Sequence, residues 1–99
     1  MASFCVSLVP GPNWDAARDR REQSGWAEHA AFMDGLVDSG FLVLGGPVGE
    51  HLDTLHLIEA ADESEVRGRL AQDPWARDLM LEVGSIRSWS LWLDSRRNT

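Results

Sequence analysis

The chain has 99 residues and a formal net charge of −7, with nine arginines and no lysine. This length predicts one domain with a modest core. The acidic balance argues against nucleic acid and anionic membranes as partners. The single cysteine, Cys5, excludes an internal disulfide and a multi-cysteine metal site, and its apolar surroundings predict a small buried hydrophobe.

The first elements are a strand and a charged segment. Residues 3–9 are apolar and stop at a Pro-Gly-Pro sequence, which predicts a strand buried on both faces. Residues 14–22 are mostly charged, and Asn13 suits the cap of a short helical turn there. A mobile loop near a pocket is the alternative for this segment. No signal-peptide pattern and no apolar run of about 20 residues is present, so we expect a cytoplasmic protein without a membrane partner.

A helix and a hairpin follow. Residues 25–39 have helical periodicity, with Ser24 as the expected cap and Gly40 as the stop. Residues 41–44 form a continuous apolar strand that the Gly-Gly-Pro sequence after it is expected to break. Residues 52–60 alternate, with Leu55 and Leu57 on one face and His56, Ile58 and Ala60 on the other. The short link between the two strands predicts a hairpin.

The last third of the chain repeats the helix–strand order. Residues 62–72 begin with a sequence resembling a capping box and predict a second helix. Asp73 and Pro74 are suited to start a short turn through residues 75–80. Residues 83–93 alternate as a final strand, and residues 94–99 are polar and expected to fray.

The predicted order is β-α-β-β-α-β, which is the ferredoxin-like α+β pattern: a four-stranded antiparallel sheet with both helices on one face. Two helices cover one face only, whereas the strands are apolar on both. The simplest cover for the second face is the same sheet of another copy, so we expect a homodimer with two sheets face to face.

His29 is the most unusual residue in this pattern. At 100° per residue it lies in the middle of an apolar helix face that includes Trp26, Met33 and Leu36. Histidine takes up and returns protons near neutral pH, so a buried-side histidine is a candidate acid/base. A core or interface histidine with its hydrogen bonds satisfied is the alternative.

The residues around His29 belong to a set of motifs that resembles the YCII-related family of small dimeric α+β-barrel proteins. The set covers nearly the whole chain in the right order: Trp26-Ala-Glu-His-Ala-Ala-Phe-Met33, Gly40-Phe-Leu-Val-Leu-Gly-Gly-Pro47, Asp73-Pro-Trp75 and Ile86-Arg-Ser-Trp89. The resemblance implies a ferredoxin-like fold, a homodimer, and a cleft containing a His–Asp pair. In this chain the pair is His29 and Asp73.

The resemblance also implies a kind of chemistry. A related family member is a dehydrochlorinase acting on a chlorinated hydroxyquinol, and the wider superfamily includes muconolactone-isomerase-like proteins and cofactor-free oxygenases. This chain departs from the common pattern at Ser88, where proline often precedes the strand aromatic. It has no tyrosine, which excludes Tyr-dependent chemistry. These departures leave the fold expectation unchanged and the substrate open.

The candidate site therefore has a catalytic pair and a cleft. His29 and Asp73 are the candidate catalytic residues, although Asp73 also suits a plain helix cap. The expected cleft-lining residues are Gly45, Gly46, Pro47, Trp26 and Trp14. The glycines allow a ligand or a neighbouring chain to approach the backbone, and their amides are candidates to hold an oxyanion; a plain strand end is the alternative. The other three tryptophans are expected in the core or a dimer interface.

Two functions fit this site. The first is a cofactor-independent enzyme in which His29 performs acid/base chemistry, by elimination or isomerisation, on a small and aromatic or cyclic organic molecule. The second is a non-catalytic dimeric module that binds a small ligand or a partner protein. We expect no cofactor for this proton-transfer chemistry. We also expect no metal, because His51 and His56 share no helical spacing with His29.

Overall fold

A computed structural model of the chain describes residues 1–50 and 52–96. In chain order the described part contains β1 (Ala2–Pro10), the short 3₁₀ turn η1 (Arg20–Glu22), α1 (Trp26–Asp38), β2 (Leu42–Pro47), β3 (Thr54–Ala60), α2 (Glu63–Leu70), the one-turn helix α3 (Pro74–Arg77) and β4 (Leu81–Ser88). No helix among these residues is long and apolar enough to cross a membrane.

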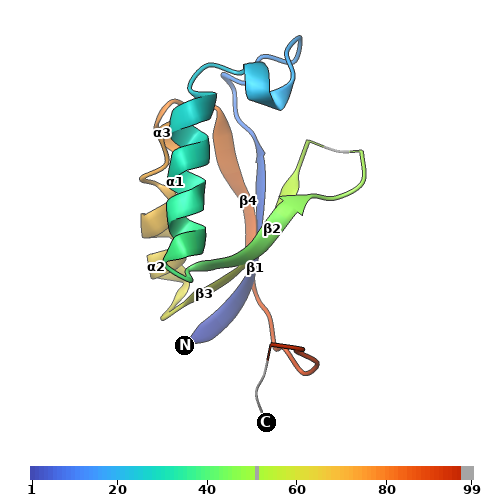
Figure 1. The fold of residues 1–99 in the computed structure, drawn as a ribbon, viewed down its shortest axis with the longest axis vertical. Coiled ribbons are helices and arrows are strands. Elements are labelled where there is room, and N and C mark those ends of the chain that lie inside the picture. The colour runs from blue at the N-terminus through green and yellow to red at the C-terminus, as the bar shows by residue number, and fades with distance from the viewer. Residues whose placement is uncertain (51, 97–99) are drawn as a thin grey trace.

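The four strands form one antiparallel sheet in the order β2-β3-β1-β4. This order is the ferredoxin-like one, and it confirms the predicted α+β fold. All helices lie on one side of the sheet, with α1 beside α2 and α3 (Figure 1). The core lies between these layers and includes Val6 of β1, Ile58 of β3, Val66 of α2 and Trp75 of α3, all fully buried.

Strand β2 is longer than the sequence pattern predicts. The prediction ended the strand at Leu44, but Gly45, Gly46 and Pro47 continue it and pair with β3. Because β2 is at the edge of the sheet, a proline without an N–H donor is tolerated there. The three residues are therefore part of a strand rather than a break in one.

The final strand is displaced toward the N-terminus. It was predicted over residues 83–93 but spans Leu81–Ser88, and Trp89 and Trp92 follow it as exposed residues rather than core aromatics. The neighbouring strand β1 begins at Ala2, so β4 has no further partner after one last bond from the Trp89 N–H to the Ser3 carbonyl. Alternation alone does not make a strand where no neighbour can pair with it.

Residues 14–22 hold only a single 3₁₀ turn, at Arg20–Glu22, instead of a helix along the segment. The buried side chain of Gln23 organises this loop. Its amide donates to the carbonyls of Asp15 and Arg18 and accepts from the Asp15 N–H. A buried glutamine satisfied by backbone groups fixes a loop without helical hydrogen bonds.

The face of the sheet opposite the helices is uncovered in the single chain. Its β2–β3 half is apolar, with Leu44 and Leu55 exposed, while its β1–β4 half carries Ser7 and Ser85, which share a hydrogen bond. Cys5, also on this face, is half-exposed rather than buried. The expectation that β1 is buried on both faces is therefore wrong for the single chain.

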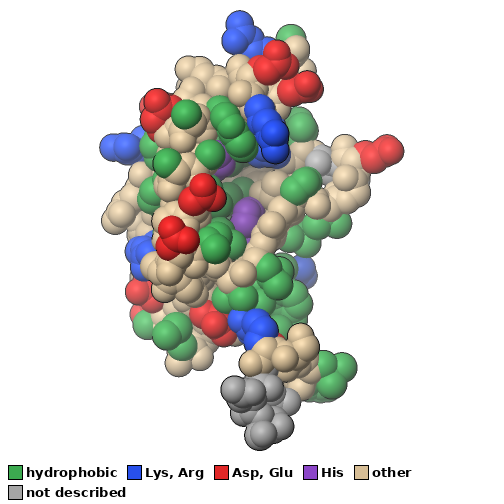
Figure 2. All heavy atoms as spheres, in the orientation of Figure 1, with side chains coloured by type: hydrophobic (Ala, Val, Ile, Leu, Met, Phe, Trp, Pro, Cys, Tyr) green, Lys and Arg blue, Asp and Glu red, His purple; other side chains and the backbone are tan. Residues whose placement is uncertain are grey.

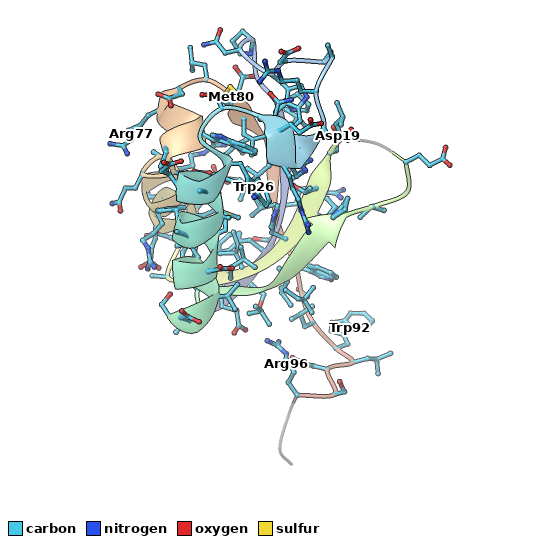
Figure 3. The ribbon with its side chains drawn as sticks, turned by 45° about the horizontal axis from the view of Figure 1, so that its top comes forward. Asp19, Trp26, Arg77, Met80, Trp92 and Arg96 are labelled. Atoms are coloured by element: carbon cyan, nitrogen blue, oxygen red, sulfur yellow. The ribbon has the colours of Figure 1, made fainter. Side chains whose placement is uncertain are left out.

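The C-terminal segment lies at the opposite end of the molecule from η1 (Figure 1). Residues 97–99 of the predicted frayed tail lie outside the described residues. In the described part of that tail, Arg96 forms a two-bond ion pair with Asp94. Figure 3 shows Trp92 and Arg96 on this segment, at the end of the molecule away from Asp19.

Candidate functional site

The structure brings His29 and Asp73 into direct contact. His29 lies on α1 and Asp73 precedes α3, yet the histidine Nδ1 is 2.7 Å from Oδ2 of the aspartate and 3.0 Å from Oδ1. The two residues are 6% and 3% exposed. Asp73 also accepts the backbone N–H of Trp75 at Oδ1, so it caps α3 and holds the imidazole at the same time. In the neutral form of the imidazole, the tautomer that donates Nδ1–H to this carboxylate has Nε2 as its unprotonated nitrogen.

Trp75 fixes the orientation of this pair. Its ring is stacked on the His29 imidazole, with centroids 4.0 Å apart and planes 9° from parallel. Its indole N–H donates to the carbonyl of Ser24 over 2.7 Å. Both contacts rest on a tryptophan that is completely buried. Trp75 therefore holds the imidazole from one face and Asp73 holds it at the Nδ1 edge, so the ring is kept in one orientation.

The start of α1 differs from the sequence prediction because of Trp75. Ser24 does not cap the helix with its side chain; Gly25 is the N-cap, with φ of 79°. A β-carbon on Gly25 would lie 3.2 Å from the indole nitrogen. Glycine is suited to this position because it adopts a positive φ at little cost and leaves space for the indole.

A cavity of about 260 Å³ opens beside His29, between α1 and the β2–β3 edge of the sheet. His29 lines it, whereas Asp73 lies behind the imidazole and does not. Figure 2 shows histidine side chains at the bottom of a hollow in this region. An apolar cavity of about 150 Å³ holds one benzene molecule, so this one has room for a single substituted ring.

Four of the five predicted cleft residues line this cavity: Gly45, Gly46, Pro47 and Trp26. Figure 3 shows Trp26 near the start of α1. Trp14, the fifth, is not among the lining residues. It packs edge-on against Trp75, with ring centroids 5.5 Å apart and planes at 86°. Trp14 therefore supports the site from behind.

Among the described cavity-lining residues that the sequence did not identify as site residues, His56 and Arg20 are the two basic ones. His56 of β3 and Arg20 of η1 both line the cavity with His29. The alternation of β3 placed His56 on the same face as Ile58, toward the helices, and this was the signal that could have identified it. Arg20 lies in a loop without periodicity, so the sequence carried no comparable signal for it.

The environment of His56 favours its neutral form. Its Nδ1 lies 3.3 Å from the carbonyl of Val6. Burial lowers the pKa of His56 below its ordinary value of 6.5, against the opposing effect of the Val6 carbonyl. Repulsion by His29 in its protonated form and by Arg20 lowers this pKa further. In its neutral form, with Nδ1–H donating to Val6, His56 has Nε2 as a free acceptor.

No three His, Cys, Asp or Glu side chains come together as a possible metal site within residues 1–50 and 52–96. His51, which was considered as a third histidine, lies outside the described residues.

Comparison of the sequence with models of protein families gives no match, and comparison with curated proteins gives none either. Membership of the YCII-related family therefore stays a prediction from the motifs.

Proposed function

We propose that this chain is a cofactor-independent enzyme that moves a proton on a small, ring-sized organic molecule, with His29 as the general acid/base and Asp73 as its orienting partner. The observation that carries the proposal is the arrangement of the imidazole. Asp73 binds Nδ1, Trp75 stacks on the ring, and the ring lines a cavity of single-ring size. A candidate base must be held within reach of its substrate, and this one is held on two sides.

The chemistry follows from the hydrogen bond at Nδ1. Because Nδ1–H donates to the carboxylate, Nε2 carries the free electron pair that removes a proton from a C–H bond of the substrate. The electrons of that bond form a carbon–carbon double bond. In an elimination, a leaving group departs with its bonding pair, and Nε2–H passes the proton to solvent. In an isomerisation, the double bond already present in the substrate shifts, and its electron pair takes the proton from Nε2–H at a different carbon. The carboxylate of Asp73 stabilises the imidazolium between these steps.

Solvent-exchange NMR tests this proposal without knowledge of the natural substrate. The wild-type protein is incubated in D₂O with a panel of single-ring ketones, unsaturated lactones and chlorinated hydroquinones, and deuterium incorporation or chloride release is followed. We expect a compound whose exchange or elimination is catalysed by the wild type and is slowed about 10²-fold or more in His29→Gln. Equal rates in wild type and a folded His29→Gln variant would contradict the acid/base role.

A non-catalytic binding module is the second candidate. It is favoured by the full satisfaction of the pair: both Asp73 oxygens lie within hydrogen-bond distance of His29 and both residues are buried, as in a structural hydrogen bond. An NMR titration separates the two candidates. If an added compound moves the His29 ring signals and its C–H protons exchange with solvent, the protein is an enzyme. If the compound moves the signals without any exchange, the protein is a binding module.

The proposed assembly is a homodimer through the uncovered sheet face. Support comes from the apolar half of that face, where Leu44 and Leu55 are 58% and 39% exposed. Burial of such a patch against its own copy is favourable because apolar surface leaves water. We also propose a cytoplasmic location, as expected from the sequence.

A further inference from the structure

The cavity beside His29 contains a cation that has no acid as a partner among residues 1–50 and 52–96. Arg20 lines the cavity with His29 and His56. In the part of the chain that the structure describes, no carboxylate lies within ion-pair distance of its guanidinium. The acids next to it in sequence, Asp19 and Glu22, are engaged with each other's backbone in a capping box.

Arg20 is nevertheless held in place. Its Nη2 donates to the carbonyl of Leu52 over 2.8 Å, and the guanidinium lies 5.2 Å from the centroid of the Trp14 ring. Trp14 is in turn packed against the core residue Trp75. A guanidinium has five N–H donors in a planar fork, and one N–H is committed to Leu52, so several donors stay available. The Arg20 side chain is therefore held in position while most of its N–H donors are available to a ligand.

The charges around the cavity also leave Arg20 available to a negatively charged ligand. Burial lowers the pKa of Arg20, which reflects a charge partly removed from water. One acid, Asp34 on α1, also lines the cavity, but it is exposed to solvent and forms no ion pair with Arg20. Arg20 is the one arginine among the described residues that line the cavity.

We propose that this cavity selects a small organic monoanion, a single ring bearing a carboxylate, by placing the carboxylate on the Arg20 guanidinium and the ring beside His29. This inference rests on the proposed function, because it assigns the substrate class of the same site. Arg20 and a carboxylate form a planar, two-bond pair of the kind that guanidinium groups favour. The neutral imidazole of His56 borders the same space and adds no positive charge, so Arg20 is the cation available to an anion there.

Equilibrium binding of two matched probes tests the inference. Benzoate and benzamide have the same ring and nearly the same shape, but only benzoate is charged. Affinities are measured by chemical-shift titration of the histidine ring signals. We expect benzoate to bind at least about tenfold more tightly than benzamide, because one charge-assisted pair distinguishes them. Equal affinity for the two probes would overturn the inference.

Variants of two adjacent arginines identify the residue responsible. We expect Arg20→Gln to weaken benzoate binding about tenfold and to leave benzamide unchanged, with Arg20→Lys between wild type and Arg20→Gln. Arg21→Gln is the matched control: Arg21 is exposed in the same 3₁₀ turn, does not line the cavity, and loses the same formal charge. Equal weakening by both Gln variants would show a general charge effect and overturn the assignment.

Failure of this inference and failure of the proposed function give different results. If His29-dependent exchange occurs on neutral ring compounds while benzoate is not preferred over benzamide, the anion inference is wrong and the acid/base proposal stands. If benzoate binding depends on Arg20 but no ring carboxylate with an acidic C–H shows His29-dependent exchange in D₂O, the acid/base proposal is wrong and the anion site stands. A thermal melt shows that each variant is folded, and Arg20→Lys replaces Arg20→Gln if the latter unfolds.

Discussion

The imidazole of His56 lies so close to Gly45 that a β-carbon on the glycine would be 2.4 Å from the histidine Cδ2. The two residues are direct partners across the β2–β3 ladder, on the face that the helices cover. The next glycine, Gly46, has no atom within 4 Å of its virtual β-carbon. The two glycines of the Gly-Gly-Pro segment therefore differ: one makes room for a cavity-lining histidine and the other does not.

Substitution of these glycines tests the difference. We expect Gly45→Ala to lower the free energy of unfolding by about 1–3 kcal/mol, because the new methyl overlaps the His56 ring. Gly46→Ala is expected to change it by less than about 0.5 kcal/mol. Urea denaturation measures both. In the His56→Ala background the overlap with the ring is gone and the 3.0 Å approach to the Leu55 carbonyl oxygen stays, so the cost of Gly45→Ala should fall. An undiminished cost in this background would refute the explanation.

A second glycine pair tests the start of α1. Gly25 combines a φ of 79° with close contact to the Trp75 indole, whereas Gly35, inside α1, has nothing within 4 Å of its virtual β-carbon. We expect Gly25→Ala to destabilise the protein by about 1–2 kcal/mol. Gly35→Ala should stabilise it by roughly 0.5–1 kcal/mol through helix propensity. Thermal and urea melts check both signs, and a neutral Gly25→Ala would refute the requirement for glycine.

Asp73→Asn separates the two roles of the aspartate. Asparagine caps a helix about as well as aspartate, so a role restricted to capping α3 predicts no loss. We expect instead a loss of about 1–3 kcal/mol in stability, because the amide replaces a carboxylate that binds the buried His29. The His29 tautomer populations, measured from ¹⁵N shifts of the ring, should also change, and the catalysed exchange should fall.

Asp62→Asn is the matched control for that variant. Asp62 caps α2 by accepting the N–H of Glu65, and it is exposed and remote from the cavity. It should therefore tolerate asparagine within about 0.5 kcal/mol. If both substitutions have similarly small effects on stability, Asp73 acts only as the cap of α3.

The lowered pKa of His56 makes stability depend on pH. The folded state holds this imidazole neutral below pH 6.5, where the unfolded chain binds a proton, so the unfolded state carries more protons in that window. Stability should therefore fall as the pH falls below about 6.5, by at most about 1.4 kcal/mol per pH unit from this group. In His56→Phe the corresponding part of the slope should disappear. Urea denaturation of both proteins between pH 5 and 8 measures it, and parallel curves would contradict the assignment.

The uncovered sheet face predicts the oligomeric state. We expect the wild type to sediment as a dimer at micromolar concentration and Leu55→Arg to sediment as a monomer, because the charge enters the apolar half of the face. Ala31→Arg, on the exposed side of α1, should stay dimeric. Analytical ultracentrifugation separates these outcomes, and a monomeric wild type would exclude this assembly.

Several features of the fold were predictable from local pattern. Helical periodicity placed His29 on the buried side of α1. Strand alternation placed His56 on one face with Ile58 and Ala60, which the structure shows to be the inward face of β3. The order of strands and helices led to the ferredoxin-like sheet. These features follow from the 3.6-residue and two-residue periods, which report the face on which a side chain lies. The periods do not report what lies opposite that face.

Partnerships between distant segments were decided by the tertiary structure. Asp73 is 44 residues from His29, and only a family resemblance pointed to it. The end of β4 depended on where β1 begins, and the role of Gly45 depended on the ring across the ladder. Arg20 joins the cavity because Leu52 and Trp14 hold a loop that has no periodicity of its own. The sequence by itself determined which faces are buried; packing in three dimensions decided which residues share the cavity.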